Sequence, residues 1–101
     1  MQDSILAQLE AISESQYFLS KYVKFIDSRK PVEGKTERHR IVPGQFGGKY
    51  IEDNCIDLSP REHRIAHRIL LLFIPGFGQR KVWLFMSATK DYHSDPVTRR
   101  K

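Results

Sequence analysis

Apolar residues recur at helical intervals in two segments near the start of the chain. Residues 4–14 show this spacing, which predicts an amphipathic helix whose N-cap is Asp3 or Ser4. A second helix is expected from about Gln16 to Asp27, where aromatic and aliphatic side chains would pack in a core. Proline, glycine and several charged residues follow in the segment 28–36, which favours a loop. The N-terminal part of the chain is therefore predicted to be helical.

Two short extended segments are predicted next. The first runs from Arg38 to Val42 and ends at a Pro-Gly pair, and the second runs from Cys55 to Leu58. The loop between them contains Gly47 and Gly48 and returns the chain to Asn54. Paired glycines allow backbone angles that are closed to other residues, as a tight crossing requires.

A third helix is predicted to begin at Ser59, and it carries two histidines. Ser59 suits the N-cap, Pro60 suits the first helical position, and Glu62 completes a capping box with Ser59. His63 and His67 are a little over one turn apart, so both imidazoles project from the same side of the helix. In this geometry two neutral imidazole nitrogens can bind one metal ion. The alternative is that both are half-buried, hydrogen-bonded residues at the edge of the core.

At about 100° per residue, the same helix divides into an apolar side and a cationic side. The apolar arc comprises Ile65, Ala66, Ile69, Leu70, Leu72 and Phe73. The opposite side carries Arg61, Arg64 and Arg68, and the two histidines lie on the border. A metal on that border would be held by the packed core and exposed to an anionic ligand.

Length and composition favour one globular domain. A chain of 101 residues with 40% hydrophobic content can bury one modest core. Its formal net charge of +5 fits a polyanionic partner, although ordinary solubility would explain that charge equally well. The single cysteine excludes an intramolecular disulfide and a cysteine zinc cluster. No secretory signal is visible and the apolar stretch at 69–74 is too short to span a bilayer, so we expect an intracellular protein with no membrane partner.

The residues upstream of the histidine pair complete a longer pattern. In order, they are Glu37-Arg38-His39-Arg40-Ile41-Val42-Pro43, then Gly47-Gly48, then Asn54, followed by Glu62-His63 and Ala66-His67. This combination resembles the HNH endonucleases, also called ββα-metal or His-Me finger nucleases. It is most similar to small phage- and intron-encoded members, many of which are homing endonucleases. The resemblance covers residues 36 to 73 well and the flanking segments loosely.

The pattern and the resemblance together predict one α+β domain over residues 1–101. Its parts would be a helical segment at 3–28, a ββα-metal core at 36–74, a C-terminal helix at 79–89 and a flexible basic tail at 90–101. The core would consist of two short antiparallel strands and the histidine-bearing helix, with the other helices flanking it.

The resemblance also implies roles for individual residues. His39, His63 and His67 match the family's metal ligands. Asn54 matches the residue that fixes the loop between the strands, and Glu37 matches an acidic residue of bacteriocin-type members. Three imidazoles with an open fourth position suit zinc or another transition metal. The expected cofactor is therefore one divalent metal ion, with zinc, magnesium, manganese and nickel as candidates.

Arg40 departs from the family pattern, because it stands where the general-base histidine is usual. Arginine stays protonated at any working pH and cannot accept a proton from water. In one interpretation the register differs, so that His39 is the base and the metal has fewer ligands. In a second, Arg40 binds the phosphate while metal-bound hydroxide or another group activates water. In a third, the protein binds nucleic acid without cutting it.

The sequence therefore favours a metal-dependent HNH endonuclease that hydrolyses phosphodiester bonds in DNA, a class that includes nicking and homing enzymes. The candidate catalytic residues are Glu37, His39, Arg40 and Asn54, and the candidate DNA contacts are Arg38, Lys49, Arg61, Arg64 and Arg68. The alternatives are a non-cleaving nucleic-acid-binding protein that retains a degenerate finger and a metal-free structural domain. One such site cuts one strand, so a double-strand cut would require a dimer or two successive events.

Overall fold

In the computed structural model, residues 1–74 form three α-helices and a two-stranded antiparallel sheet, and the structure describes only these residues. The helices are α1 (Asp3–Ile12), α2 (Gln16–Asp27) and α3 (Pro60–Phe73), and the strands are β1 (Glu37–Arg40) and β2 (Cys55–Leu58). The predicted α+β class is confirmed. The predicted helix at 79–89 and the tail at 90–101 lie outside the described residues. No helix within residues 1–74 is long and apolar enough to cross a membrane.

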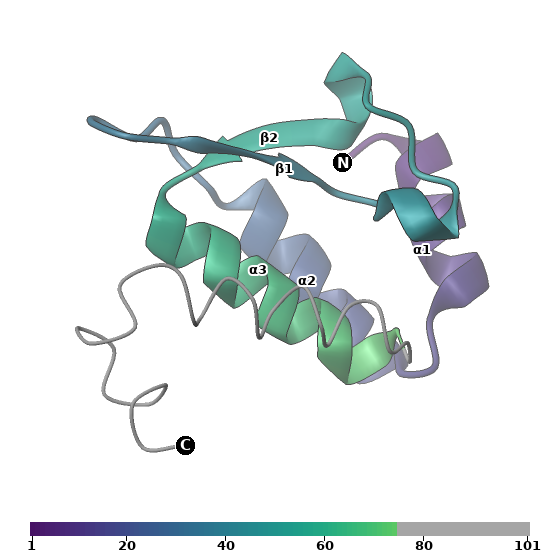
Figure 1. The fold of residues 1–101 in the computed structure, drawn as a ribbon. Helices are drawn as coiled ribbons and strands as arrows, with labels where there is room; N and C mark the ends of the chain where they lie inside the picture. The colour runs from purple at the N-terminus through teal and green to yellow at the C-terminus, as the bar shows by residue number, and fades with distance from the viewer. Residues whose placement is uncertain (75–101) are drawn as a thin grey trace.

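The sheet lies across the packed pair of α2 and α3, with α1 at one end (Figure 1). Buried hydrophobic residues from all three helices, from β2 and from the segment after β1 form one core. They are Ile5, Leu9, Leu19, Tyr22, Ile26, Ile41, Val42, Leu58, Ala66, Leu70, Phe73 and Ile74. The backbone N–H of Glu14 donates to the carbonyl of Phe73 at 2.7 Å, which ties the turn between α1 and α2 to the end of α3. The ββα part therefore shares its core with the N-terminal helices.

The limits of α2 and the start of α3 agree with the sequence, whereas α1 runs from Asp3 to Ile12 and not over residues 4–14. The Ser59 hydroxyl accepts from the Glu62 N–H at 3.1 Å, and the Glu62 carboxylate accepts from the Ser59 N–H at 3.0 Å, which confirms the predicted capping box. The predicted N-cap of α1 is wrong, because the cap position is Gln2 and no side chain caps that end. Asp3 lies within the first turn instead, where its negative charge interacts favourably with the positive end of the helix dipole.

β1 ends two residues earlier than predicted, at Arg40 rather than Val42. The strands pair antiparallel, with Arg40 opposite Cys55. Beyond this pair, the N–H of Ile41 donates to the Asn54 carbonyl at 2.8 Å, and the N–H of Val42 donates to the Asn54 side chain at 2.8 Å. The ladder ends at Arg40 because the Asn54 side chain takes the place of the next strand partner.

The predicted division of α3 into an apolar side and a cationic side is only partly correct. Arg64 is 7% exposed, so the prediction that it faces outward with Arg61 and Arg68 is wrong. Ile65 and Leu72 were expected in the apolar arc, yet they are 36% and 50% exposed. Because α2 and the sheet both pack against α3, its buried surface is wider than the apolar stripe and rotated from it.

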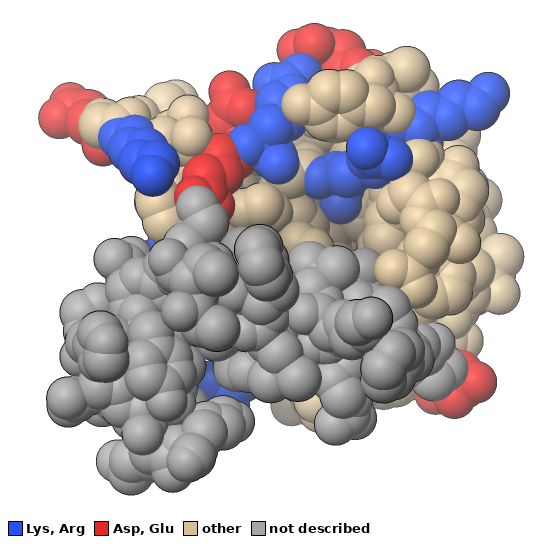
Figure 2. Space-filling view, viewed as in Figure 1, with Lys and Arg blue, Asp and Glu red and all other residues tan. Residues whose placement is uncertain are grey.

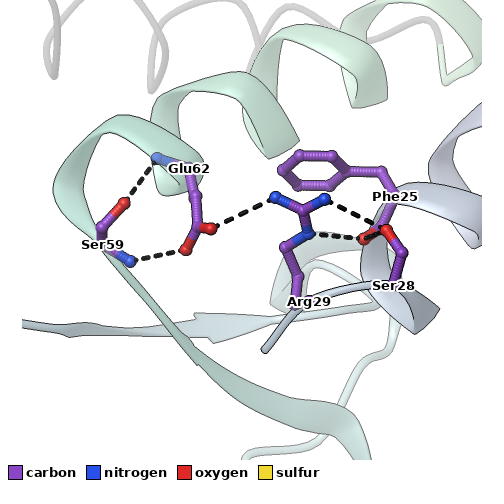
Figure 3. A network of polar contacts seen from close by, with 5 residues as sticks. All are labelled: Phe25, Ser28, Arg29, Ser59 and Glu62. Carbon is purple, nitrogen blue, oxygen red and sulfur yellow. Dashed lines mark hydrogen bonds and ion pairs between the residues drawn. The ribbon is translucent and has the colours of Figure 1, made fainter. Parts of the chain in front are cut away.

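A polar network ties the end of α2 to the start of α3 (Figure 3). Arg29 Nη1 donates to the Glu62 carboxylate at 3.2 Å, and Arg29 Nε donates to the Phe25 carbonyl at 2.9 Å. The Arg29 guanidinium also lies 4.1 Å from the centre of the Phe25 ring, which is a cation–π distance. Because Glu62 also caps α3 through Ser59, this network fixes the first turn of the helix that carries His63.

Candidate metal centre

Three imidazoles meet between β1 and α3. The ring centres of His39 and His63 are 5.1 Å apart, those of His39 and His67 are 5.2 Å apart, and those of His63 and His67 are 4.9 Å apart. One nitrogen of each ring lies within 4.8 Å of a nitrogen of the other two. The strand and the helix thus bring three histidines close enough together to hold one metal ion, as the sequence predicts.

The regular geometry of both elements explains this meeting. Successive side chains of a strand point to opposite faces, so Glu37 and His39 face α3 together. On α3, His63 and His67 lie between the buried residues Arg64 and Ala66 around the helix axis. Both helical histidines are partly buried, and the buried surface of α3 extends past them to Arg64.

His39 is held by a hydroxyl group in the core. The Tyr22 hydroxyl donates to the Ile41 carbonyl at 2.8 Å, and its oxygen lies 2.8 Å from His39 Nε2. A tyrosine hydroxyl has one proton to give, so Nε2 carries a hydrogen and donates it to the Tyr22 oxygen. The lone pair of the neutral ring is then on Nδ1, which is buried and has no hydrogen-bond partner among the described residues.

The environment of His39 also keeps its ring neutral. His39 is 1% exposed, and burial lowers its pKa well below the ordinary value of 6.5. The neighbouring His67 and His63 lower this pKa further, because a positive charge on either ring disfavours a second one nearby. A histidine must be unprotonated at the nitrogen that binds a metal, so a neutral His39 is ready for that role.

His63 is oriented by a carboxylate. Its Nδ1 lies 2.9 Å from Glu37 Oε1, and both side chains are largely buried. An ionised carboxylate can only accept, so Nδ1 carries the hydrogen and Nε2 of the neutral ring holds the lone pair. Histidines that bind metals commonly donate their other N–H to a carboxylate, which fixes the tautomer and the ring orientation. The predicted acidic residue Glu37 therefore contacts a candidate ligand directly.

This donor set fits a divalent transition metal. Imidazole nitrogens suit zinc, copper, iron and nickel. Two nitrogens bound to one tetrahedral metal at about 2.1 Å lie roughly 3.4 Å apart. The nitrogens of His39, His63 and His67, which lie within 4.8 Å of one another, would close to that spacing through small side-chain rotations. The unpaired Nδ1 of the buried His39 is the strongest sign of a missing partner, since buried polar atoms are nearly always bonded.

Asn54 makes hydrogen bonds across the loop between the strands, as the resemblance implies. It is 1% exposed, and its Oδ1 accepts from the Val42 N–H at 2.8 Å. Its Nδ2 donates to the Val42 carbonyl at 3.1 Å and to the Lys49 carbonyl at 2.9 Å. One side-chain amide thereby joins the residues after β1 to the loop just before β2.

The two loop glycines meet different requirements. Gly47 has a φ of 93°, in the left-handed region that favours glycine. Gly48 is needed for space, because a Cβ there would lie 1.7 Å from the Val42 carbonyl oxygen and 2.9 Å from Asn54 Nδ2. The close approach at Gly48 is what allows Asn54 to bridge the loop.

Arg40 lies on the opposite face of β1 from His39. Its Nη1 donates to the Gly48 carbonyl at 3.3 Å, and its guanidinium lies 5.1 Å from the centre of the exposed Tyr50 ring. Arg40 therefore contacts the loop that Asn54 and Gly48 organise. Because successive side chains of a strand alternate, it points away from the three-histidine cluster.

The basic residues predicted to contact DNA differ in their surroundings. Figure 2 shows basic side chains along the part of this face that lies over the sheet, with acidic side chains among them. Lys49, Arg61 and Arg68 are exposed. Arg38 is exposed as well, but it forms ion pairs at 3.2 Å with both Glu52 and Asp57. Together with the burial of Arg64, this leaves a smaller set of outward-facing basic residues than predicted.

The chain is similar over about half of its length to one phage protein. Over 48 residues it is 40% identical to a protein of Enterobacteria phage T4 named probable mobile endonuclease E. The match covers 48% of this chain but 34% of that protein, so the chain spans about a third of the length of this relative. No protein-family model matches the chain, and no solved structure is significantly similar to it. A relationship to a phage endonuclease is supported, and the HNH family remains a proposal.

Tyr22 is the functional candidate that sequence reasoning missed. Its segment predicts a helix whose aromatics pack in the core, and Tyr22 is indeed fully buried there. Its hydroxyl, however, contacts His39 across 17 positions of sequence. The only local sign of this role is a hydroxyl group on the apolar face of a helix. That sign is not specific, because Tyr17 on the same helix also carries a hydroxyl and is exposed.

Proposed function

We propose that this protein is a metal-dependent HNH-type endonuclease that hydrolyses phosphodiester bonds in DNA. The observation that carries the proposal is the cluster of His39, His63 and His67, in which the buried His39 has an unpaired nitrogen. The asparagine-bridged loop beside this cluster and the similarity to a phage protein named as an endonuclease support the same function.

The three histidines would hold one divalent cation. Such a cation supplies positive charge to the scissile phosphate and to the leaving oxygen. Tyr22 and Glu37 fix the rings of His39 and His63, so these ligands need little reorganisation when the substrate arrives.

Arg40 serves best as a phosphate clamp. A guanidinium offers five N–H donors, and Arg40 uses one of them for the Gly48 carbonyl. Its charge and planar shape match a phosphate group, and its position next to the exposed Tyr50 leaves it half-buried at the surface. The interpretation in which His39 is the base is disfavoured, because His39 is 1% exposed and donates its Nε2 hydrogen to Tyr22.

A non-cleaving nucleic-acid-binding protein is the second candidate function. The observation that favours it is Arg40, which cannot take a proton from water at the position of the usual base. In this case the metal would stabilise the fold, and the exposed basic residues would still bind DNA.

Zinc titration of the full chain followed by plasmid nicking tests both functions. We expect one zinc per chain in the wild type and a large loss of zinc affinity in His63→Ala. His93→Ala is the matched control, because it removes the one imidazole outside the proposed ligand set. Equal zinc affinity in His63→Ala and the wild type would overturn the ligand assignment.

Nicking is then measured with Mg²⁺, Mn²⁺, Ni²⁺ and Zn²⁺. Under the phosphate-clamp role, Arg40→Ala should lower both DNA affinity and cleavage, whereas Arg40→His should retain or increase cleavage by restoring the usual base. Cleavage by Arg40→His but not by the wild type would identify a nuclease that has lost its activity. Zinc and DNA binding without nicking by either protein would favour the non-cleaving function.

A further inference from the structure

We infer that Tyr22 is a positioning residue of the metal centre. Its hydroxyl holds His39 in the tautomer that carries the hydrogen on Nε2, so that Nδ1 presents its lone pair to the metal. The inference rests on the proposed three-histidine site, and it adds a residue of α2 that lies outside the ββα part of the fold.

The Tyr22 hydroxyl donates one hydrogen bond and accepts another. The Ile41 carbonyl can only accept, so the Tyr22 hydroxyl donates to it at 2.8 Å. The same oxygen lies 2.8 Å from His39 Nε2 and can then only accept. If the hydroxyl donated to His39 Nε2 instead, the buried Ile41 carbonyl would lose this partner, which is costly inside a core.

The hydroxyl keeps its proton under ordinary conditions. Tyr22 is fully buried, and burial raises its pKa well above the ordinary value of 10. The tautomer of His39 follows from the two hydrogen bonds of this hydroxyl.

Packing keeps the hydroxyl at this position. The Tyr22 ring packs against Phe73 with 5.4 Å between ring centres and against the His39 ring at 6.3 Å. The carbonyl that it binds belongs to Ile41, whose N–H donates to the Asn54 carbonyl. Tyr22 therefore links the core, a candidate metal ligand and the asparagine-bridged loop. Phenylalanine would fill the same volume but could make neither hydrogen bond.

The first test compares zinc affinity in Tyr22→Phe and Tyr17→Phe, measured in the full chain by competition with a chromogenic chelator. Tyr17 lies on the same helix and is 63% exposed, so Tyr17→Phe removes a hydroxyl from α2 without touching the core. Loss of a group that orients a metal ligand typically weakens metal binding about 10- to 100-fold. We expect a loss of that size in Tyr22→Phe and none in Tyr17→Phe.

The second test reads the tautomer without any metal. In the metal-free wild type, ¹⁵N NMR of the histidine side chains should show His39 protonated on Nε2, and Tyr22→Phe should shift this ring towards the other tautomer. A structural role alone would lower stability while leaving both the tautomer and the zinc affinity unchanged. If Tyr22→Phe does not fold, the wild-type spectrum decides, because a His39 protonated on Nδ1 overturns the inference.

The outcomes separate this inference from the proposed function. If the wild type binds no zinc, the metal centre is overturned and the positioning role falls with it. If the wild type binds zinc and Tyr22→Phe binds it equally tightly, only the positioning role of Tyr22 is overturned.

Discussion

Replacing Asn54 by alanine should destabilise the protein while leaving its metal ligands in place. The Asn54 amide makes three hydrogen bonds to backbone groups, two to Val42 and one to Lys49. Alanine removes all three without adding any atom to the loop. The loop after β1 should therefore lose its main connection to the residues before β2.

The size of the effect follows from which groups are left without partners. The N–H and C=O of Val42 are buried, and each unsatisfied buried group costs about 1–3 kcal/mol. Lys49 is exposed, so its carbonyl can bind water and adds little. The unfolding free energy should fall by about 2–6 kcal/mol, out of roughly 5–15 kcal/mol for an ordinary domain. Asn54→Ala should thus remain folded at room temperature if the wild type is not at the lower end of that range.

Urea unfolding followed by circular dichroism, in the presence of EDTA, measures this change. Asp53→Ala is the matched control, because Asp53 is the exposed neighbour and should change stability by less than about 0.5 kcal/mol. Asn54→Leu has nearly the same shape as the native residue but makes no hydrogen bond. A cost close to that of alanine would assign the effect to hydrogen bonds and not to lost volume.

The structural role of Asn54 is separate from metal binding. His63 and His67 lie on α3 and His39 lies in β1, so Asn54→Ala should still bind zinc while nicking falls. A change in unfolding free energy close to that of Asp53→Ala would refute the structural role. Loss of zinc binding with nicking retained would refute it as well.

Measurable effects are also expected at Gly48, at His39 and at the pair of Arg61 and Arg68. Gly48→Ala should lower the unfolding free energy, measured with urea, by about 1–3 kcal/mol or more, because its Cβ would lie 1.7 Å from the Val42 carbonyl oxygen. Gly44→Ala should lower it less, because the new Cβ meets only the movable end of the Arg40 side chain. The pKa of His39 is lowered in the folded state, so the unfolded chain takes up a proton first as the pH falls. The unfolding free energy of the metal-free protein should therefore decrease below about pH 6.5, by up to about 1.4 kcal/mol per pH unit. An unfolding free energy in EDTA that does not change with pH would contradict this. Replacing both Arg61 and Arg68 by alanine should reduce the slope of log affinity for duplex DNA against log salt by about 2, measured by fluorescence anisotropy, and an unchanged slope would exclude them as phosphate contacts.

The features that could be predicted from sequence depend on residues close together in the chain. The capping box at Ser59 and Glu62 and the shared side of His63 and His67 need only the geometry of one helix. The limits of α2 follow in the same way from its apolar spacing. The contribution of His39 came from the resemblance to a family, because no local rule relates a strand residue to a helix more than twenty positions away.

The features that were missed depend on what packs against each element. Arg64 is charged and was expected to face outward, but it is 7% exposed, and its burial could not be read from the spacing of residues along α3. β1 ends early because a side-chain amide, that of Asn54, replaces the strand partner of Val42. The hydroxyl of Tyr22 has a role only because folding brings His39 to it. In each case the deciding group comes from another part of the chain.

The alternation of side chains along β1 gives adjacent residues separate tasks. His39 points towards α3 and completes the histidine cluster, whereas Arg40 points to the other face and contacts the loop at Gly48. Arg40→Ala should therefore leave zinc affinity unchanged, because it alters no candidate metal ligand. Under the proposed function the same change should lower nicking, so the two assays together distinguish the phosphate contact from the metal site.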